Sequence, residues 1–340
     1  MSQRAYLASV ALLALALVLV GAGSVGVGAV PLAPADVWEA LARGGAGGGA
    51  ATSRAIVWDL RLPRILLAAL IGGGLAASGA AFQGLFRNPL ADPFIVGASG
   101  GAALGATLAI VYGAAWGPLP GGAVPLAAFA GAVLAVALVY GVAEVGGATP
   151  VIALALAGTA LSTLFSAVVS LLMMLNDRSL QETYMWLLGG LSGRSWPALR
   201  ASWMYLLAGS AGLALLARPL DALSLGDETA QSLGLSVGRG RALVVLTATL
   251  TTAAAVASAG IIGFVGLIAP HIARLLFGAG HARLIPASAL LGALLLIVAD
   301  DLARTVLAPI ELPVGIVTAI LGGPFFLYLL KARQRELGGG

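Results

Sequence analysis

Three arginines, Arg61, Arg64 and Arg304, are of a type and at a spacing suited to the recognition of carboxylates. Arg61 and Arg64 are three residues apart, so they share one face of a predicted helix. A guanidinium group is planar and can donate two parallel hydrogen bonds to a carboxylate. The arginines either anchor helix ends and neutralise nearby acidic residues, or they dock an acidic surface of another protein. The nearby acidic residues are Asp59, Asp300 and Asp301.

A polar segment, 218–241, is the second candidate for contact with another protein. Asp227 and Glu228 stand at a predicted helix start within it, where acidic residues complement the helix dipole. Gly234 interrupts the segment, and four leucines give it an apolar side. These leucines are Leu223, Leu225, Leu233 and Leu235. From these residues alone, the segment is either a solvated loop or an amphipathic docking element.

Residue types that carry catalysis or bind metals are scarce. The single lysine, Lys331, follows no glycine-rich turn, whereas a phosphate-binding loop requires a lysine after such a turn. The two histidines, His271 and His281, are not at a metal-ligand spacing, and there is no cysteine. We therefore expect no catalytic residue, no metal site and no cofactor bound by this chain. His271 is interpreted as structural, with a haem ligand as the alternative.

Composition indicates an all-α integral membrane protein. The chain has 340 residues, of which 60% are hydrophobic and 9% charged, and its mean hydropathy is +1.02. A soluble domain carries about 25% charged residues. At roughly 20 residues per span, a single transmembrane domain, 1–340, accommodates about ten helices. We expect them at 5–30, 60–85, 93–111, 124–142, 150–174, 198–216, 242–262, 266–277, 284–304 and 313–330.

The order of these helices indicates an inverted repeat. Predicted helices two to five and seven to ten run in opposite senses across the membrane, and each set has a segment interrupted by glycine and proline near its start. The first apolar run is longer than the core of a signal peptide, so we expect a retained helix. Ten spans, together with a basic C-terminal tail, put both termini in the cytoplasm.

Two blocks carry a resemblance to a known family. The first is RLPRILLAALIGGGLAASGAAFQGLFRNPLADPFIVGASGGAALG at 61–105, and the second comprises GIIGFVGLIAPHIARLLFG at 260–278 and ADDLARTVLAPIELPVGIVTAILGGPFFLYLL at 299–330. The chain resembles the permease subunit of ATP-binding-cassette importers (type II) for ferric siderophores, haem and cobalamin. The resemblance covers essentially the whole chain.

The resemblance implies a homodimer in the bacterial plasma membrane, with two separate ATPase subunits that use ATP and magnesium. It implies that Arg61, Arg64 and Arg304 receive glutamates of a substrate-binding protein, and that 218–241 docks the ATPase. It puts an internal gate near Thr149 and Pro150. Gln83 and Asn88 add polar groups to the expected pathway. No nucleic-acid partner is expected.

Three functions remain in competition. The leading one is import of an iron complex or cobalamin, with the iron complex preferred because it is the broadest class in the family. The second is an ion-coupled secondary transporter, which would use carboxylates within the membrane; Asp300 and Asp301 are its candidates. A membrane enzyme comes third, because no Ser/His/Asp set or metal-bound water site is evident.

Overall fold

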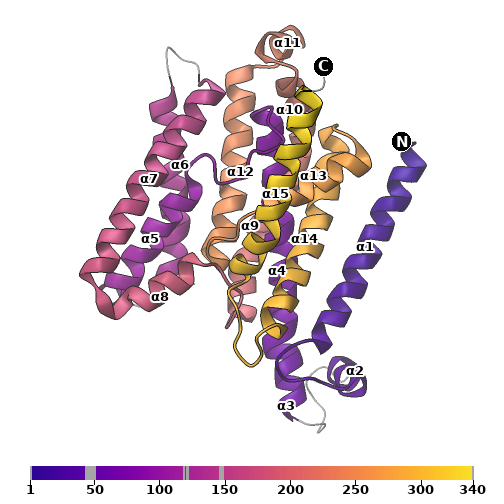
Figure 1. Cartoon of the computed structure of the whole chain (residues 1–340), viewed down its shortest axis with the longest axis vertical. Helices are drawn as coiled ribbons and strands as arrows, with labels where there is room; N and C mark the ends of the chain where they lie inside the picture. Colours follow the sequence, from indigo (N-terminus) through magenta and orange to yellow (C-terminus); the bar gives the residue numbers. More distant parts are fainter. Residues whose placement is uncertain (1, 43–50, 118, 120–121, 145–148, 339–340) are drawn as a thin grey trace.

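The computed structural model describes residues 2–42, 51–117, 119, 122–144 and 149–338, and in these ranges every regular element is a helix. Figure 1 shows the helices side by side in one elongated bundle. The elements are α1 (Gln3–Gly26), α2 (Pro34–Ala42), α3 (Ala51–Arg54), the π-helix η1 (Ala55–Arg61), α4 (Leu62–Leu85), α5 (Ala98–Tyr112), the 3-10 helix η2 (Gly113–Trp116), α6 (Ala123–Ala143), α7 (Val151–Leu175), α8 (Asp177–Leu187), α9 (Trp196–Leu215), α10 (Ala217–Ser224), α11 (Asp227–Ser232), α12 (Val237–Ala259), α13 (Val265–Phe277), α14 (His281–Thr305) and α15 (Val314–Gly338).

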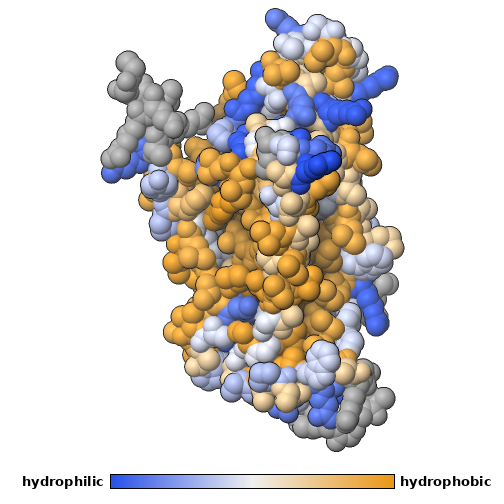
Figure 2. Space-filling model, turned by 90° about the vertical axis from the view of Figure 1, so that its right-hand side faces the viewer, coloured by the Kyte–Doolittle hydropathy of each residue, from blue (hydrophilic) through white to orange (hydrophobic). Residues whose placement is uncertain are grey.

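The fold class is confirmed as an all-α membrane protein. Seven helices of the described chain are long and apolar enough to cross a membrane, and the bent pair α9 and α10, at 53°, makes an eighth. Two shorter apolar helices, α5 and α13, complete the set that corresponds to the ten predicted ones. Figure 2 shows a broad hydrophobic band across the middle of the face in view, with hydrophilic residues gathered toward both ends. A bilayer fits around that band.

Several predicted boundaries were wrong. The prediction began the third helix at residue 93, but α5 begins at Ala98. The side chains of Asn88 and Asp92 accept hydrogen bonds from the backbone N–H groups of Leu90 and Phe94, 3.0 and 2.9 Å away, so this stretch forms turns instead. The seventh helix begins earlier than predicted, at Val237, so the end of the segment 218–241 belongs to α12.

The two halves pack as an inverted repeat requires. The four helices α4–α7 of the first half correspond in order to α12–α15 of the second. Accordingly, α4 packs against α14 and α12 packs against α6. The second helix of each half is short, and each begins after a residue with a left-handed backbone, Gly97 (φ 87°) or Phe264 (φ 68°). Each half therefore contains one interrupted segment beside the shared interface.

Glycine permits close contact between the halves where α4 crosses α14. A Cβ atom at Gly72 on α4 would overlap the carbonyl group of Gly292 on α14, and a Cβ at Gly292 would overlap that of Gly72. Helices in lipid associate through packing and not through exclusion of water. Small residues at such a crossing therefore strengthen the association of the two helices. At one end of the bundle lie α10, α11, the start of α1 and the end of α15; α2, α3 and α8 lie at the other (Figure 1).

Candidate functional site

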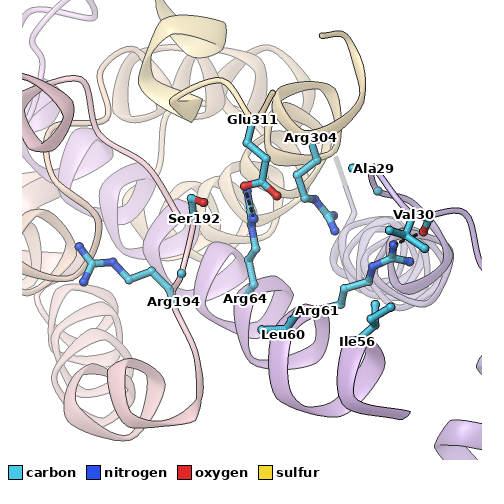
Figure 3. A pocket seen from close by; sticks show the side chains of 12 residues that line it. Ala29, Val30, Ile56, Leu60, Arg61, Arg64, Ser192, Arg194, Arg304 and Glu311 are labelled. Carbon is cyan, nitrogen blue, oxygen red and sulfur yellow. Dashed lines mark hydrogen bonds and ion pairs between the residues drawn. The ribbon is translucent and has the colours of Figure 1, made fainter. Parts of the chain in front are cut away.

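The arginines Arg61, Arg64 and Arg304 come together at the end of the bundle that holds α2 and α3, around a cavity of about 210 Å³. The end of η1 and the start of α4 provide two of them, and the last turn of α14 provides the third. Figure 3 shows Arg64 extended toward Glu311 and Arg61 toward Val30. The expected cluster therefore exists, although its three side chains are buried.

Two of the arginines are held by carboxylates of the same chain. Asp300 is 1% exposed and accepts hydrogen bonds from Arg64 at 2.9–3.1 Å, and it lies 3.2 Å from Arg304. Asp301 also pairs with Arg304, and Glu311 pairs with Arg64 at 2.8 Å. A buried ion pair is costly to break because the remaining charge loses its partner, typically by about 3–5 kcal/mol. These pairs fix the geometry of the cavity.

The third arginine has a different environment. Arg61 donates to the backbone carbonyl groups of Val25, at 2.8 Å, and Val30, at 2.5 Å. It forms no ion pair in the part of the chain that the structure describes. Within the described residues its hydrogen bonds therefore go to carbonyl dipoles and not to a carboxylate, and an incoming carboxylate would improve that environment.

A fourth arginine lines the same cavity, and sequence reasoning missed its role. Arg194, in the loop between α8 and α9, points away from the other three (Figure 3). Its Nε atom is buried and has no hydrogen-bond partner among the described residues, and burial lowers its pKa. Burial also acts to raise the pKa of Glu311, but the hydrogen bond and charge of Arg64 outweigh it, so this pKa lies below its usual value. No pattern in the sequence marks either residue.

A second cluster lies at the opposite end, where α11 meets α4 and α12. Asp227 accepts hydrogen bonds from Arg87 at 2.9 Å and from Arg241 at 2.8 and 2.9 Å. Arg241 also donates to the backbone carbonyl of Thr149 at 2.6 Å. Beside this cluster lies a cleft of about 630 Å³, which is lined by the start of α7 and by α11. The sequence signalled Asp227, but not the two arginines that hold it.

The residues predicted to contact a partner within 218–241 divide into two sets. Leu225, Glu228, Leu233 and Gly234 are exposed at the surface. By contrast, Leu223 is buried in the bundle, and Leu235 and Asp227 are partly buried. The exposed set can meet another protein, whereas the inner set attaches α10 and α11 to the membrane helices.

The predicted gate residues do not form one group. Gln83 is buried within the bundle, where its Oε1 atom accepts from Arg274 at 3.0 Å. Asn88 is exposed and stabilises its own turn. Thr149 and Pro150 lie directly before α7, beside Arg241. Thr149 is therefore the predicted gate residue that hydrogen-bonds to the segment 218–241, through Arg241.

The histidines lie apart from each other. His281 is buried at the start of α14, and its Nδ1 atom lies 2.6 Å from Asp221 on α10. His271 packs edge-on against Phe325, with ring centroids 5.8 Å apart. Among the described residues, no three His, Asp or Glu side chains are grouped so as to hold a metal ion.

Comparisons with known proteins agree with this architecture. The profile of the FecCD transport family matches residues 13–332. The chain is 40% identical to the Fe(3+)-citrate import system permease protein YfmE of Bacillus subtilis, over 98% of both chains. It is 47% identical to the cobalamin import system permease protein BtuC of Halobacterium salinarum, over 83% of this chain and 75% of the relative.

A haem permease and a solved structure extend the comparison. The hemin transport system permease protein HmuU of Yersinia pestis is 40% identical over 95% of both chains. A metal-chelate type ABC transporter, solved in an inward-facing conformation, superposes with a TM-score of 0.82 at 33% identity, over 95% of this chain and 98% of that one. With a family profile that spans nearly the whole sequence, the chain belongs to the FecCD transport family.

Proposed function

We propose that this chain is the membrane-spanning permease subunit of an ATP-driven importer for an iron complex, haem or cobalamin. The observation that carries the proposal is the match to a ferric-citrate permease over 98% of both chains. Haem and cobalamin permeases match as well, so the three cargo classes stay in competition. The iron complex is preferred because it is the broadest class in the family.

We propose that a substrate-binding protein docks at the end that carries the arginine cavity. Four arginines line this cavity, and two of them, Arg61 and Arg194, form no ion pair within the described residues. A glutamate that enters the cavity would meet Arg61, whose guanidinium is already oriented by its hydrogen bonds to two backbone carbonyls. Docking of an acidic surface thus needs little rearrangement of the permease.

We propose that a separate ATPase binds at the other end and supplies ATP hydrolysis with magnesium. Leu225 and Leu233, exposed by 67% and 65%, offer it an apolar contact beside the acidic residue Glu228. The start of α1 and the end of α15 lie at this end (Figure 1), so both termini are cytoplasmic in the proposed orientation within the plasma membrane.

We propose further that two copies of the chain form the pathway, with α7 at their contact. Few residues of α7 are buried. Its exposed surface carries hydroxyl groups at a helical spacing, on Thr159, Thr163, Ser166 and Ser170. Their hydroxyl groups largely bond to carbonyls one turn earlier. Such a surface binds cargo weakly, which suits a passage that must release what enters it.

Uptake into proteoliposomes tests the function. The permease would be reconstituted with the ATPase encoded nearest to it and with a candidate binding protein. We expect ATP-dependent uptake of one cargo among ferric citrate, a ferric siderophore, haem and cobalamin, measured in parallel. Uptake that ignores ATP but follows a proton or sodium gradient would instead support an ion-coupled transporter. The bonding of Asp300 to Arg64 and Arg304 argues against a freely titrating carboxylate there.

A further inference from the structure

Arg241 joins two parts of the molecule that a cleft otherwise separates. The cleft of about 630 Å³ lies between the start of α7 and α11. At its edge, the Arg241 guanidinium donates twice to the carboxylate of Asp227 on α11, and once to the carbonyl oxygen of Thr149, two residues before α7. One rigid group therefore spans from α11 to the residues that precede α7.

The Arg241 side chain is well placed to transmit movement. It is 5% exposed and extends from the first turns of α12, whose body packs against α4, α6 and α9. Its guanidinium is planar and holds three hydrogen bonds in fixed directions, so displacement of Asp227 changes the force on Thr149. The contact with Thr149 is to the backbone, which acts on the chain path and not on a mobile side chain.

Asp227, on α11, is the acidic partner of Arg241 in this link. Its carboxylate accepts hydrogen bonds from both Arg241 and Arg87. Arg87 also donates a hydrogen bond to the carbonyl oxygen of Leu223 at 3.2 Å. Leu225 and Leu233 flank Asp227 along the chain and are exposed. A partner that presses on these leucines therefore moves the same short segment that carries the carboxylate.

We propose that Arg241 is a positioning residue that transmits displacement of α11 to the start of α7. This inference rests on the proposed function, because it assumes that an ATPase binds against α11. In the importer, ATP-driven closure of the ATPase moves α11, and the Asp227–Arg241–Thr149 link moves the end of α7 that borders the pathway. Lysine would keep the charge but could not maintain both contacts, because its single ammonium lacks the fork of arginine.

A fluorescent probe tests the link directly. The chain contains no cysteine, so Ile152→Cys gives one labelling site, on α7 in the cleft and 74% exposed. The purified chain would be labelled with bimane before the ATPase is added. Emission would be recorded in proteoliposomes with ADP, and with ATP plus vanadate. The Ile152→Cys probe would be placed in four backgrounds. These are the chain with no other change, Arg241→Lys, Asp227→Asn and, as a control at an exposed arginine, Arg4→Lys.

We expect ATP to shift the emission in the wild-type and Arg4→Lys backgrounds, and we expect most of the shift to be lost with Arg241→Lys and Asp227→Asn. ATP hydrolysis and co-purification of the ATPase should persist in these two variants, whereas uptake per ATP hydrolysed falls.

An undiminished shift in either variant would overturn the inference alone. No ATP-dependent shift in the wild-type background, with the ATPase bound, would count against the proposed function itself. Loss of the ATPase from both variants would show that the pair holds the assembly together, and would likewise overturn the link.

Discussion

Among single residues, Arg61 is distinguished from Arg64 and Arg304 by its partners. Arg64 and Arg304 neutralise Asp300 in the interior, whereas the hydrogen bonds of Arg61 within the described residues go to backbone carbonyls. Reversing the charge at Arg64 would place a further carboxylate beside Asp300 and Glu311 and so disturb folding. Arg61 is therefore the position at which docking can be tested separately from stability.

Arg61→Gln is expected to weaken docking of the binding protein by at least about tenfold, since a hydrogen bond to a charged group contributes about 1.5–3 kcal/mol. Because the glutamine amide is shorter than the arginine side chain, whose outer nitrogens donate to Val25 and Val30, some loss of thermal stability is expected, and the unfolding midpoint is measured in parallel to show that the variant stays folded. Binding would be measured by surface plasmon resonance at two salt concentrations, because removal of the charge should also reduce the salt dependence. Arg4→Gln, at the other end, serves as the control. Unchanged affinity and salt dependence would exclude Arg61 from the interface.

The sequence predicted which arginines gather, but not how they are bonded. Arg61 and Arg64 are close in sequence, and hydropathy alone puts them at a helix end. By contrast, Arg64 and Asp300 are 236 residues apart, and Arg241 and Thr149 are 92 apart. Such pairs depend on how distant helices pack, for which composition and periodicity contain no signal. Arg194 illustrates the same limit, because only the folded cavity distinguishes it from an ordinary loop arginine.

Among the elements, α10 and α11 show how a short amphipathic segment is divided between two tasks. Leu223 anchors α10 in the bundle, and Asp221 on the same helix pairs with His281. Leu225 and Leu233 face outward. The leucine pattern indicated an apolar side, but the sequence could not tell which leucines would be covered by this chain and which would remain for a partner.

Leu225→Ser combined with Leu233→Ser is expected to weaken the ATPase complex at least about tenfold. Burial of a leucine contributes about 1.5–3 kcal/mol, and tenfold corresponds to about 1.4 kcal/mol. Because both side chains are exposed in the isolated chain, the thermal unfolding midpoint should stay unchanged. Co-purification at graded ATPase concentrations measures the effect. Leu307→Ser, an exposed leucine at the opposite end, is the control; full retention of the ATPase by the double variant would remove this surface from the proposed contact.

For the whole molecule, the crossing of α4 and α14 unites the two halves. An ideal Cβ atom at Gly72 would also lie 2.8 Å from the Cβ atom of Leu296. The hydrophobic lengths of these helices were predictable, since a bilayer imposes them. Their pairing was not predicted, because glycine is frequent throughout this sequence and its frequency does not reveal which glycines touch.

Gly72→Ala is expected to destabilise the chain by about 1–3 kcal/mol or more, as overpacking does. Gly141→Ala on α6 is the matched control, because a Cβ atom there meets nothing within 4 Å. The control should be neutral, or more stable by up to about 1 kcal/mol through helix propensity. The fraction of protein that stays monodisperse after heating, measured by size-exclusion chromatography in detergent at a series of temperatures, gives a midpoint for each variant and so distinguishes Gly72→Ala from Gly141→Ala. Equal midpoints would show that the halves can separate at this crossing without loss.

Helix α1 is fastened to the bundle near both of its ends, while most of its surface remains exposed. Near one end, Tyr6 donates to the carbonyl of Arg283 at 3.2 Å. Near the other, Ser24 bonds to Asp301 and to Arg304. The eighteen residue steps from Tyr6 to Ser24 span about 27 Å of helix, close to the hydrocarbon thickness of a bilayer, about 30 Å. We therefore expect a mismatch between α1 and a thinner or thicker bilayer to act on the contact of Ser24 with Arg304 at the edge of the arginine cavity.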